Sequence, residues 1–570
     1  MNRQGILHIP DSKYCFPLDE RTLVLRLRLD KRDAIEKIEL IYESKYRIQQ
    51  QQNKLLMEKK YEDRAYAWYE TRLELSDVRF SYIFRIWENG CGLYYSEDGL
   101  TEEYDFSVAY FNFFQMPYIN AADVHREVPW MRNAVFYEIF VERFFRGKKR
   151  KDDSYINMEW GDKPTPKSFA GGDIPGITAK LDYLCDLGVN TLYLTPIFRS
   201  VSNHKYDISD YHVIDEQFGS NADFDRLVKE AHARGMRIVL DAVFNHCSEF
   251  LPQFQDVKKK GSKSQYFDWF MIRGDMPVKD PLNYEVFAFC DYMPKFNTSN
   301  PQLQEFLINI ATSWIRKYDI DGWRLDVSDE VSHDFWRMFR KEVKEVKPDS
   351  VIIGENWHDA NTFLHGDQYD GIMNYAFTKA CLDYYANGTF TAGQFAQKLS
   401  ELLMRNTWQV NHMMLNLLDS HDTDRFFTCV EKNPYKLLSA VAVMCMFVGA
   451  PCIYYGTEIL MEGGYDPDNR RCFDWQQEHW DKEFMESVKK VLALRRDLTV
   501  THGEIRIFAE GDLFILQRSD GGKKILFVAN QSGSPVSVQT EGTLLMESRY
   551  DGGSLGTDGF LIEVRKGEQK

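Results

Sequence analysis

A strand–helix alternation runs from about residue 134 to about residue 496, and it constrains the fold more than any other feature of the sequence. Eight short apolar runs, bounded by turn-like residues, are separated by stretches with helical spacing. This is the pattern of buried parallel strands and the helices that cover them. The runs occupy residues 134–144, 189–198, 237–245, 322–327, 351–356, 371–375, 412–422 and 450–458. The alternation predicts an α/β chain with a (β/α)₈ TIM barrel.

The helices of this barrel carry their own start and stop signals. Ser220 is placed to cap a helix, with Asp223 three residues later, and Gly235 ends the helical spacing that follows. The last helix is expected between Trp480 and Arg496. Residues 247–300 show no clear periodicity, so we expect an inserted loop subdomain that stands over the mouth of the barrel.

Both ends of the chain instead show the period-two alternation of β-strands. Residues 23–30 and 78–86 alternate in this way, and the alternation returns after about Leu498. We therefore expect an N-terminal β-sandwich over residues 1–121, the barrel with its inserted subdomain over residues 122–497, and a C-terminal β-domain over residues 498–570.

Composition excludes several classes of partner. The net charge of −16 argues against nucleic acid and against an anionic membrane surface. The 10 cysteines are scattered without a CxxC pair, so neither a zinc site nor a disulfide framework is indicated. The N-terminus lacks an apolar signal-like segment, and no stretch approaches the length of a membrane-spanning helix. We expect a reduced, cytoplasmic protein.

The fourth apolar run contains two charged residues, Arg324 and Asp326. Side chains two apart on a strand point the same way, so these two share one face. Because a buried carboxylate needs a partner, we expect Arg324 to pair with Asp326 and to hold it ionised, as a catalytic nucleophile requires. A purely structural salt bridge is the alternative that this stretch alone leaves open.

Polar residues also stand at the ends of other strands, where the active sites of such barrels lie. They are Asp241, Asn245 and His246 after strand three, Glu355, Trp357 and His358 after strand five, and His421 and Asp422 after strand seven. The carboxyl ends of all eight strands meet at one mouth of a barrel, so these side chains are expected to converge.

Two carboxyl groups that flank one bond are the equipment of glycoside hydrolysis. Asp326 is expected to be the ionised nucleophile, and Glu355, in an apolar strand, the acid whose pKa is raised by desolvation. Asp422 would bind sugar hydroxyls more tightly as the ring flattens in the transition state. A retaining mechanism requires the two catalytic carboxyl groups to lie about 5–5.5 Å apart.

Four motifs at these strand ends resemble those of the alpha-amylase superfamily, and most closely its neopullulanase, cyclomaltodextrinase and maltogenic-amylase branch. They are Asp241–His246 (DAVFNH), Gly322–Asp326 (GWRLD), Gly354–His358 (GENWH) and Ser420–Asp422 (SHD). Met293–Asn297 (MPKFN) is similar to a further signature of this branch, and the resemblance covers nearly the whole chain. The N-terminal module resembles the branch's starch-binding-type domain, which pairs two chains, so the resemblance implies a homodimer.

The resemblance also implies a catalytic set and a substrate-binding set. The catalytic residues would be Asp326 as nucleophile, Glu355 as general acid/base and Asp422 as transition-state stabiliser. The substrate-binding residues would be His204, Tyr206, His246, Phe287, Arg324, Glu330, Trp357, His421, Asp466 and Arg470. Tyr206 would stack on the sugar, and Trp357, Glu330 and Phe287 would lie toward the acceptor side. For Phe287, a place in the core of the inserted segment is an open alternative.

The sequence departs from the family pattern at three places. Asp329 stands where this branch often has Asn, which leaves the bond specificity open. Asp419 and Asp424 flank the fourth motif where many relatives have Gly and Pro. The calcium site that many relatives build after strand one needs oxygen ligands, but that place holds Gly147, Lys148 and Lys149. Gly172 and Asp173 of its later half remain, and Asp152 and Asp153 are nearby. We expect no metal ligands and no required cofactor, with calcium binding weak or absent.

Together these features predict a retaining α-glucan hydrolase. Its substrates would be cyclodextrins, pullulan or malto-oligosaccharides, cleaved at α-1,4 bonds, with α-1,6 cleavage and transglycosylation left open. One alternative is a catalytically silent carbohydrate-binding relative, and the presence of all three acids argues against it. The other is an α-1,6-glucosidase or branching-type transferase, and the N-terminal module and the MPKFN motif argue against that.

Overall fold

The computed structural model describes residues 1–108, 111–147 and 152–567. By its contacts the chain divides into two compact units. The first comprises Met1–Glu127, Phe390–Asn411 and Arg506–Ile515, and the second comprises Val128–Thr389, His412–Ile505 and Leu516–Lys570. Each unit is considered by itself below.

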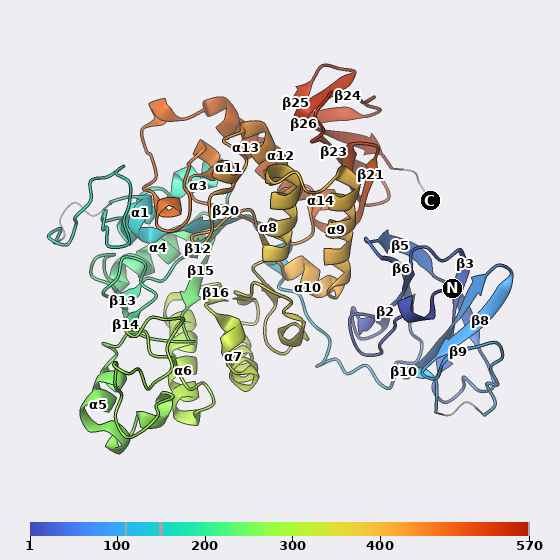
Figure 1. Ribbon diagram of the computed structural model, residues 1–570, viewed down its shortest axis with the longest axis horizontal. Coiled ribbons are helices and arrows are strands. Elements are labelled where there is room, and N and C mark those ends of the chain that lie inside the picture. Colours follow the sequence, from blue (N-terminus) through green and yellow to red (C-terminus); the bar gives the residue numbers. More distant parts are fainter. Residues whose placement is uncertain (109–110, 148–151, 568–570) are drawn as a thin grey trace. The chain divides into compact units, whose positions relative to one another are not determined.

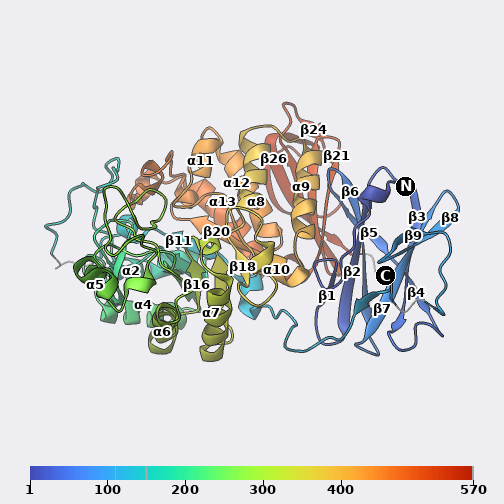
Figure 2. The same ribbon diagram turned by 60° about the horizontal axis from the view of Figure 1, so that its bottom comes forward.

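The first unit contains a sandwich of two antiparallel sheets (Figure 2). One sheet has the order β1 (Cys15–Pro17), β2 (Thr22–Asp30), β6 (Tyr66–Glu74) and β5 (Glu58–Glu62). The other has the order β4 (Asn53–Leu56), β3 (Ile35–Ser44), β7 (Phe80–Glu88), β8 (Cys91–Ser96) and β9 (Gly99–Thr101), with β10 (Phe114–Met116) paired to β7. Alternate residues of β2 and β7 are buried between the sheets, as their period-two pattern predicts. The predicted N-terminal β-sandwich is confirmed.

The second unit is built around a sheet of eight parallel strands (Figure 1). Their order is β18 (Gly371–Ile372), β17 (Val351–Gly354), β16 (Gly322–Leu325), β15 (Arg237–Ala242), β12 (Thr191–Leu194), β11 (Phe136–Ile139), β20 (Ala450–Tyr454) and β19 (Leu415–Leu417). A parallel bridge between Met373 and Leu415 joins the two end strands, so the sheet closes on itself. Each strand lies within one of the apolar runs, and the predicted barrel is confirmed.

Helices follow the strands around the outside of this barrel (Figure 1). The main ones are α2 (Ile174–Ala179), α3 (Leu181–Leu187), α4 (Asn221–Ala233), α6 (Pro301–Tyr318), α7 (His333–Val346), α8 (Tyr375–Cys381), α12 (Pro434–Met446) and α13 (Lys482–Ala493). The predicted cap of α4 is present, because the Ser220 side chain accepts the Asp223 backbone N–H and the Asp223 side chain accepts that of Ser220. The last helix begins two residues later than predicted, because Asp481 caps it.

Residues between β15 and α6 form the inserted segment. It contains α5 (Pro252–Lys260) and isolated bridges that join His246 to Lys295 and Val286 to Pro294. Its buried aromatic side chains pack on one another, with Phe254 and Phe270 ring centroids 4.8 Å apart. The segment therefore has a small core of its own and is held to the C-terminal end of β15.

The chain ends in a further sheet, as the returning alternation predicts. Its order is β21 (Glu504–Glu510), β22 (Leu513–Ser519), β23 (Lys523–Asn530), β26 (Ser554–Lys566) and β24 (Val536–Ser537), with β25 (Thr543–Tyr550) paired to β26. The domain limits at residues 121 and 497 stay predictions. Within the described ranges, no helix has the length and apolar character needed to cross a bilayer.

Candidate active site

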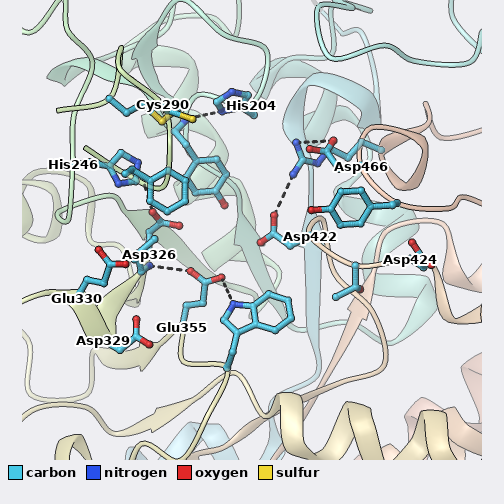
Figure 3. A pocket seen from close by; sticks show the side chains of 18 of the residues that line it. His204, His246, Cys290, Asp326, Asp329, Glu330, Glu355, Asp422, Asp424 and Asp466 are labelled. Atoms are coloured by element: carbon cyan, nitrogen blue, oxygen red, sulfur yellow. Dashed lines mark hydrogen bonds and ion pairs between the residues drawn. The ribbon is translucent and has the colours of Figure 1, made fainter. Parts of the chain in front are cut away.

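A cavity of about 870 Å³ lies at the C-terminal ends of the barrel strands, with the inserted segment along one side (Figure 3). Every residue of the two sets that the resemblance implies lines this cavity except Arg324 and His421, which are buried behind it. Of the other strand-end residues that were expected to converge, Asp241 and Asn245 are buried and His358 is exposed, and none of the three lines the cavity. The predicted residues on its wall are His204, Tyr206, His246, Phe287, Asp326, Glu330, Glu355, Trp357, Asp422, Asp466 and Arg470. Sequence motifs hundreds of residues apart thus converge on one mouth of the barrel.

Arg324 is the centre of one group of charges, here called the Arg324 cluster. Its Nη1 lies 2.8 Å from Asp326 Oδ1 and 3.0 Å from Asp241 Oδ2, and its Nη2 lies 2.9 Å from Glu355 Oε2. Asp241 Oδ2 also accepts hydrogen bonds from the hydroxyls of Tyr193 and Tyr206. The sequence predicted a pair of Arg324 with Asp326, but one guanidinium serves three carboxyl groups.

This sharing changes the expected charge of Asp326. Burial raises the pKa of Asp326 well above its usual range, Arg324 opposes the rise, and repulsion from Glu355 and Asp241 adds to it. The predicted pair of Arg324 with Asp326 is present, but the direction of the pKa shift runs against the expectation that this pair holds Asp326 ionised. Burial also raises the pKa of Glu355, against Arg324, as predicted. Both carboxyl groups lie next to one cation, an arrangement that favours one acid and one anion over two anions.

Two segments of the chain orient the Glu355 side chain, the residue before it and the turn after β16. A Cβ on the preceding Gly354 would meet Tyr369 Cε2 at 2.6 Å, so the close packing there requires glycine. Val327 adopts a left-handed conformation, with φ 43°, and its N–H donates to Glu355 Oε2 at 2.9 Å. Such a conformation is costly for a β-branched residue and is typical of functional sites.

Trp357 supplies a further contact to the same carboxyl group. Its Nε1 donates to Glu355 Oε1 at 3.2 Å, and its ring stacks on Tyr375 with centroids 3.8 Å apart and an interplanar angle of 6°. Trp357 is 45% exposed, so the open face of its ring is available to a ligand in the cavity. The stack fixes the direction of the indole N–H toward Glu355.

Asp422 belongs to a second group of charges, here called the His421 cluster, which faces the first across the cavity (Figure 3). Asp422 lies 3.1 Å from His421 Nε2 and 3.1 Å from Arg470 Nη2. Burial alone would raise the pKa of Asp422, but His421 and Arg470 outweigh it, so the pKa lies below the usual range. Arg470 also holds Asp466, at 3.1 Å, so the predicted pair is brought together.

Besides the stack of Trp357 on Tyr375, two further stacks involve aromatic residues of the predicted site. Tyr206 stacks on His421 with centroids 5.5 Å apart, and His246 stacks on Phe287 with centroids 4.6 Å apart. Phe287 lines the cavity and does not lie only in the core of the inserted segment. Burial lowers the pKa of His204 to about 4 and that of His246 to about 3, so both are neutral at pH 7.

Several residues of the site were missed in the sequence. Lys295 lies 2.8 Å from Glu330 Oε2 and ties the inserted segment to the turn that follows β16. Glu138 contacts His421; it is one of two acids in the apolar run 134–144, and an acid within a buried strand is the signal that could have indicated it. The other cavity residues, which lie outside the two predicted sets, are Cys290, Tyr292, Met293, Val327, Asp329, Thr378, Leu382, Leu418, Thr423, Asp424, Cys429 and Tyr465.

Around Asp173, where the family pattern would place a calcium site, the described side chains do not form a set of metal ligands. Asp173 Oδ1 accepts the N–H groups of Gly147 and Gly176 and caps α2. No group of three or more His, Cys, Asp or Glu suited to an ion occurs in the described ranges. The basic residues 148–151, on which part of the calcium prediction rests, lie outside them, so that prediction remains open.

Comparisons with known proteins bear on the family of the chain and on its fold. A family model for the alpha amylase catalytic domain matches residues 138–515, and one for the alpha amylase N-terminal ig-like domain matches residues 1–120. A cyclomaltodextrinase from Thermoanaerobacter pseudethanolicus is 40% identical over 537 residues, covering 93% of each chain. Neopullulanase 2 from Thermoactinomyces vulgaris is 38% identical, covering 99% of this chain and 96% of its own. A solved structure of a cyclomaltodextrinase has a TM-score of 0.91 at 34% identity, covering 100% of this chain and 98% of its own.

Proposed function

Because the chain belongs to the alpha-amylase family of glycoside hydrolases, we propose that it hydrolyses cyclodextrins, pullulan and malto-oligosaccharides at α-1,4 bonds by double displacement with retention. One observation carries the mechanism: Asp326 and Glu355 reach the same guanidinium and line the same cavity. Asp326 Oδ2 has no hydrogen-bond partner among the described residues, so this oxygen is free to attack.

In the first step, Asp326 Oδ2 forms a bond to the anomeric carbon while the bond to the leaving oxygen breaks. Glu355 gives its proton to that oxygen, which departs as a sugar hydroxyl. Asp422 is held ionised by His421 and Arg470, so it binds sugar hydroxyls and favours the positive charge that develops on the ring. Arg324 stabilises the carboxylate of Glu355 as the proton leaves.

In the second step, Glu355 takes a proton from water, and the oxygen of that water displaces Asp326 from the anomeric carbon. A sugar hydroxyl in place of water gives transglycosylation with the same balance of atoms. Glu330 and Trp357 line the same cavity, and Trp357 contacts Glu355, so we place the acceptor against these two side chains. Asp329 lies beside Glu330, so we propose that the acceptor side of this chain sets its preference between α-1,4 and α-1,6 bonds.

Azide can separate the two proposed roles, with α-maltosyl fluoride as substrate because fluoride leaves without a proton. In Asp326→Ala, azide attacks from the vacated side, and a single inversion gives β-maltosyl azide. In Glu355→Ala, azide replaces water in the second step, and two inversions give α-maltosyl azide. Without azide, Asp326→Ala should lose about 10⁴-fold or more of its kcat on maltotriose. Retained hydrolysis by Asp326→Ala, or the same anomer from both variants, would contradict the assignment.

We propose further that the protein forms a homodimer through its N-terminal module and works in the cytoplasm without a required metal. Large apolar side chains on this module are exposed, with Tyr46 at 66% and Leu56 at 59%. The cysteines are free thiols, most of them buried, which suits a reducing compartment. Sedimentation of the full chain and of Tyr46→Ser/Leu56→Ser tests the dimer, and a loss of melting temperature on chelation would contradict the absence of a required metal.

A further inference from the structure

Glu138 is a buried acid that the proposed mechanism does not use. It lies in β11 with 0% exposure, inside the barrel and behind the cavity wall. Its Oε1 lies 2.5 Å from His421 Nδ1 and accepts the His421 backbone N–H at 3.2 Å. Its Oε2 is buried without a hydrogen-bond partner among the described residues. Burying an ionised carboxyl group costs free energy unless the group is paired with an opposite charge.

The hydrogen bonds around His421 require both ring nitrogens to donate. Nδ1 faces the carboxylate of Glu138, and Nε2 faces Asp422 Oδ2 at 3.1 Å; ionised carboxylates only accept. Nε2 also lies 2.6 Å from the Tyr206 hydroxyl, whose own hydrogen is donated to Asp241. No neutral tautomer of His421 satisfies these contacts, because each has a lone pair on one of the two nitrogens.

We propose that Glu138 is a positioning residue that holds His421 in its doubly protonated form and thereby keeps Asp422 ionised and oriented toward the substrate. The three side chains form a continuous row, carboxylate, imidazolium, carboxylate, that runs from the barrel interior to the cavity. Glu138 acts from behind and touches no substrate. The effect on turnover rests on the proposed function, whereas the protonation of His421 does not.

The other groups that face His421 do not replace this role. Arg470 donates through Nε to the His421 carbonyl at 2.8 Å, and as a cation it opposes protonation of the ring. Tyr206, after β13 (Phe198–Ser200), stacks on the ring and is neutral. Burial would lower the pKa of His421, but Asp422 and Glu138 outweigh burial and Arg470, so the pKa is raised. Glu138 is thus the one of these two carboxylates that does not bind a sugar.

The test is the titration of His421 in Glu138→Gln, which keeps the shape of the side chain and removes its charge. Protein labelled with [13C]histidine carries 13 signals, and that of His421 is assigned by its loss in His421→Gln. In the wild type His421 should titrate above 6.5, and in Glu138→Gln about one to three pH units lower. The matched control is Glu458→Gln, another buried acid, bound by the hydroxyls of Tyr137 and Tyr183, which should leave the titration unchanged.

Kinetics separate this role from a purely structural one. In Glu138→Gln, kcat should fall as pH rises above the new pKa of His421 and recover at lower pH, whereas a packing defect would lower kcat equally at every pH. Glu138→Asp keeps the charge and should recover part of the titration and of the alkaline activity. The proposal is overturned if wild-type His421 titrates below pH 6.5, or if Glu138→Gln leaves the pKa of His421 unchanged. If the titration moves as expected but Asp326→Ala remains active, the proposed function fails and this inference stands.

Discussion

The Arg324 cluster and the His421 cluster face the same cavity, but the pKa values of Asp326 and Glu355 shift in the opposite direction from that of Asp422. In the Arg324 cluster one cation serves Asp241, Asp326 and Glu355, and the pKa values of the last two rise. In the His421 cluster two cations, His421 and Arg470, contact the single carboxyl group of Asp422, and its pKa falls. The side chain of Asp422 is also 30% exposed, against 7% and 8% for Asp326 and Glu355.

The comparison shows that a cation beside a carboxyl group does not by itself decide the charge of that group. Desolvation acts on every buried carboxyl, and the outcome depends on how many carboxyl groups share each cation. Catalysis can use both outcomes. The crowded cluster retains a proton for the leaving oxygen, and the cluster rich in cations keeps a permanent anion for the developing positive charge.

Replacing the arginine of each cluster should give the largest difference between the two clusters. Arg324→Met removes the cation that three buried carboxyl groups share and should cost about 3–5 kcal/mol in the free energy of unfolding at pH 7. Arg470→Met is the matched control, because its partners Asp422 and Asp466 are 30% and 39% exposed. It should cost at most about 2 kcal/mol. Urea unfolding of both variants measures the difference, and equal costs would refute the contrast.

Neutral isosteres of the acids should change the melting temperature with opposite signs. The pKa of Glu355 is raised, so its contribution to stability is present below pH 4.5 and is lost as pH rises through the folded-state value. Glu355→Gln should therefore melt about 1–2 °C higher than the wild type at pH 8. The pKa of Asp422 is lowered, so its contribution is present above pH 3.8 and is lost as pH falls through the folded-state value.

Asp422→Asn forfeits that contribution and should melt about 1–2 °C lower than the wild type at pH 8. The gap for Glu355→Gln should close as pH falls toward 4, whereas the gap for Asp422→Asn should persist there and close only at still lower pH. Calorimetric scans at pH 4, 6 and 8 follow both differences. Shifts of the same sign in the two variants would mean that the clusters do not differ as described.

The smallest expected effect sharpens the account of Glu355 itself. Trp357→Phe keeps an aromatic ring on Tyr375 but removes the N–H that donates to Glu355 Oε1. The ionised form of Glu355 loses a donor, so its pKa and the alkaline limb of kcat/KM should rise by about 0.5–1 pH unit. Tyr375→Phe keeps the stack and this hydrogen bond, so the limb should stay in place. A limb that does not move in Trp357→Phe would show that the contact does not bear on ionisation.

The barrel and the three acids were predictable because their signals are local. Apolar runs, the Ser220 cap and Gly235 act within a few residues, and a strand end identifies which side chains reach the mouth of a barrel. The sharing of Arg324 was not predictable, because Asp241 stands 83 residues from it in the sequence. The left-handed backbone conformation of Val327 was not predictable either, since valine carries no preference for that conformation.

The sequence by itself determined which chemical groups are present and that a closed parallel barrel would gather them at one end, since side-chain period and hydrophobic burial depend on neighbours along the chain. Only the tertiary structure decided which groups share a charge. Glu138 and His421 are 283 residues apart and meet only because β20 alone separates β11 from β19 in the closed barrel. Ionisation depends on distance and desolvation in space, and neither is written in the order of the residues.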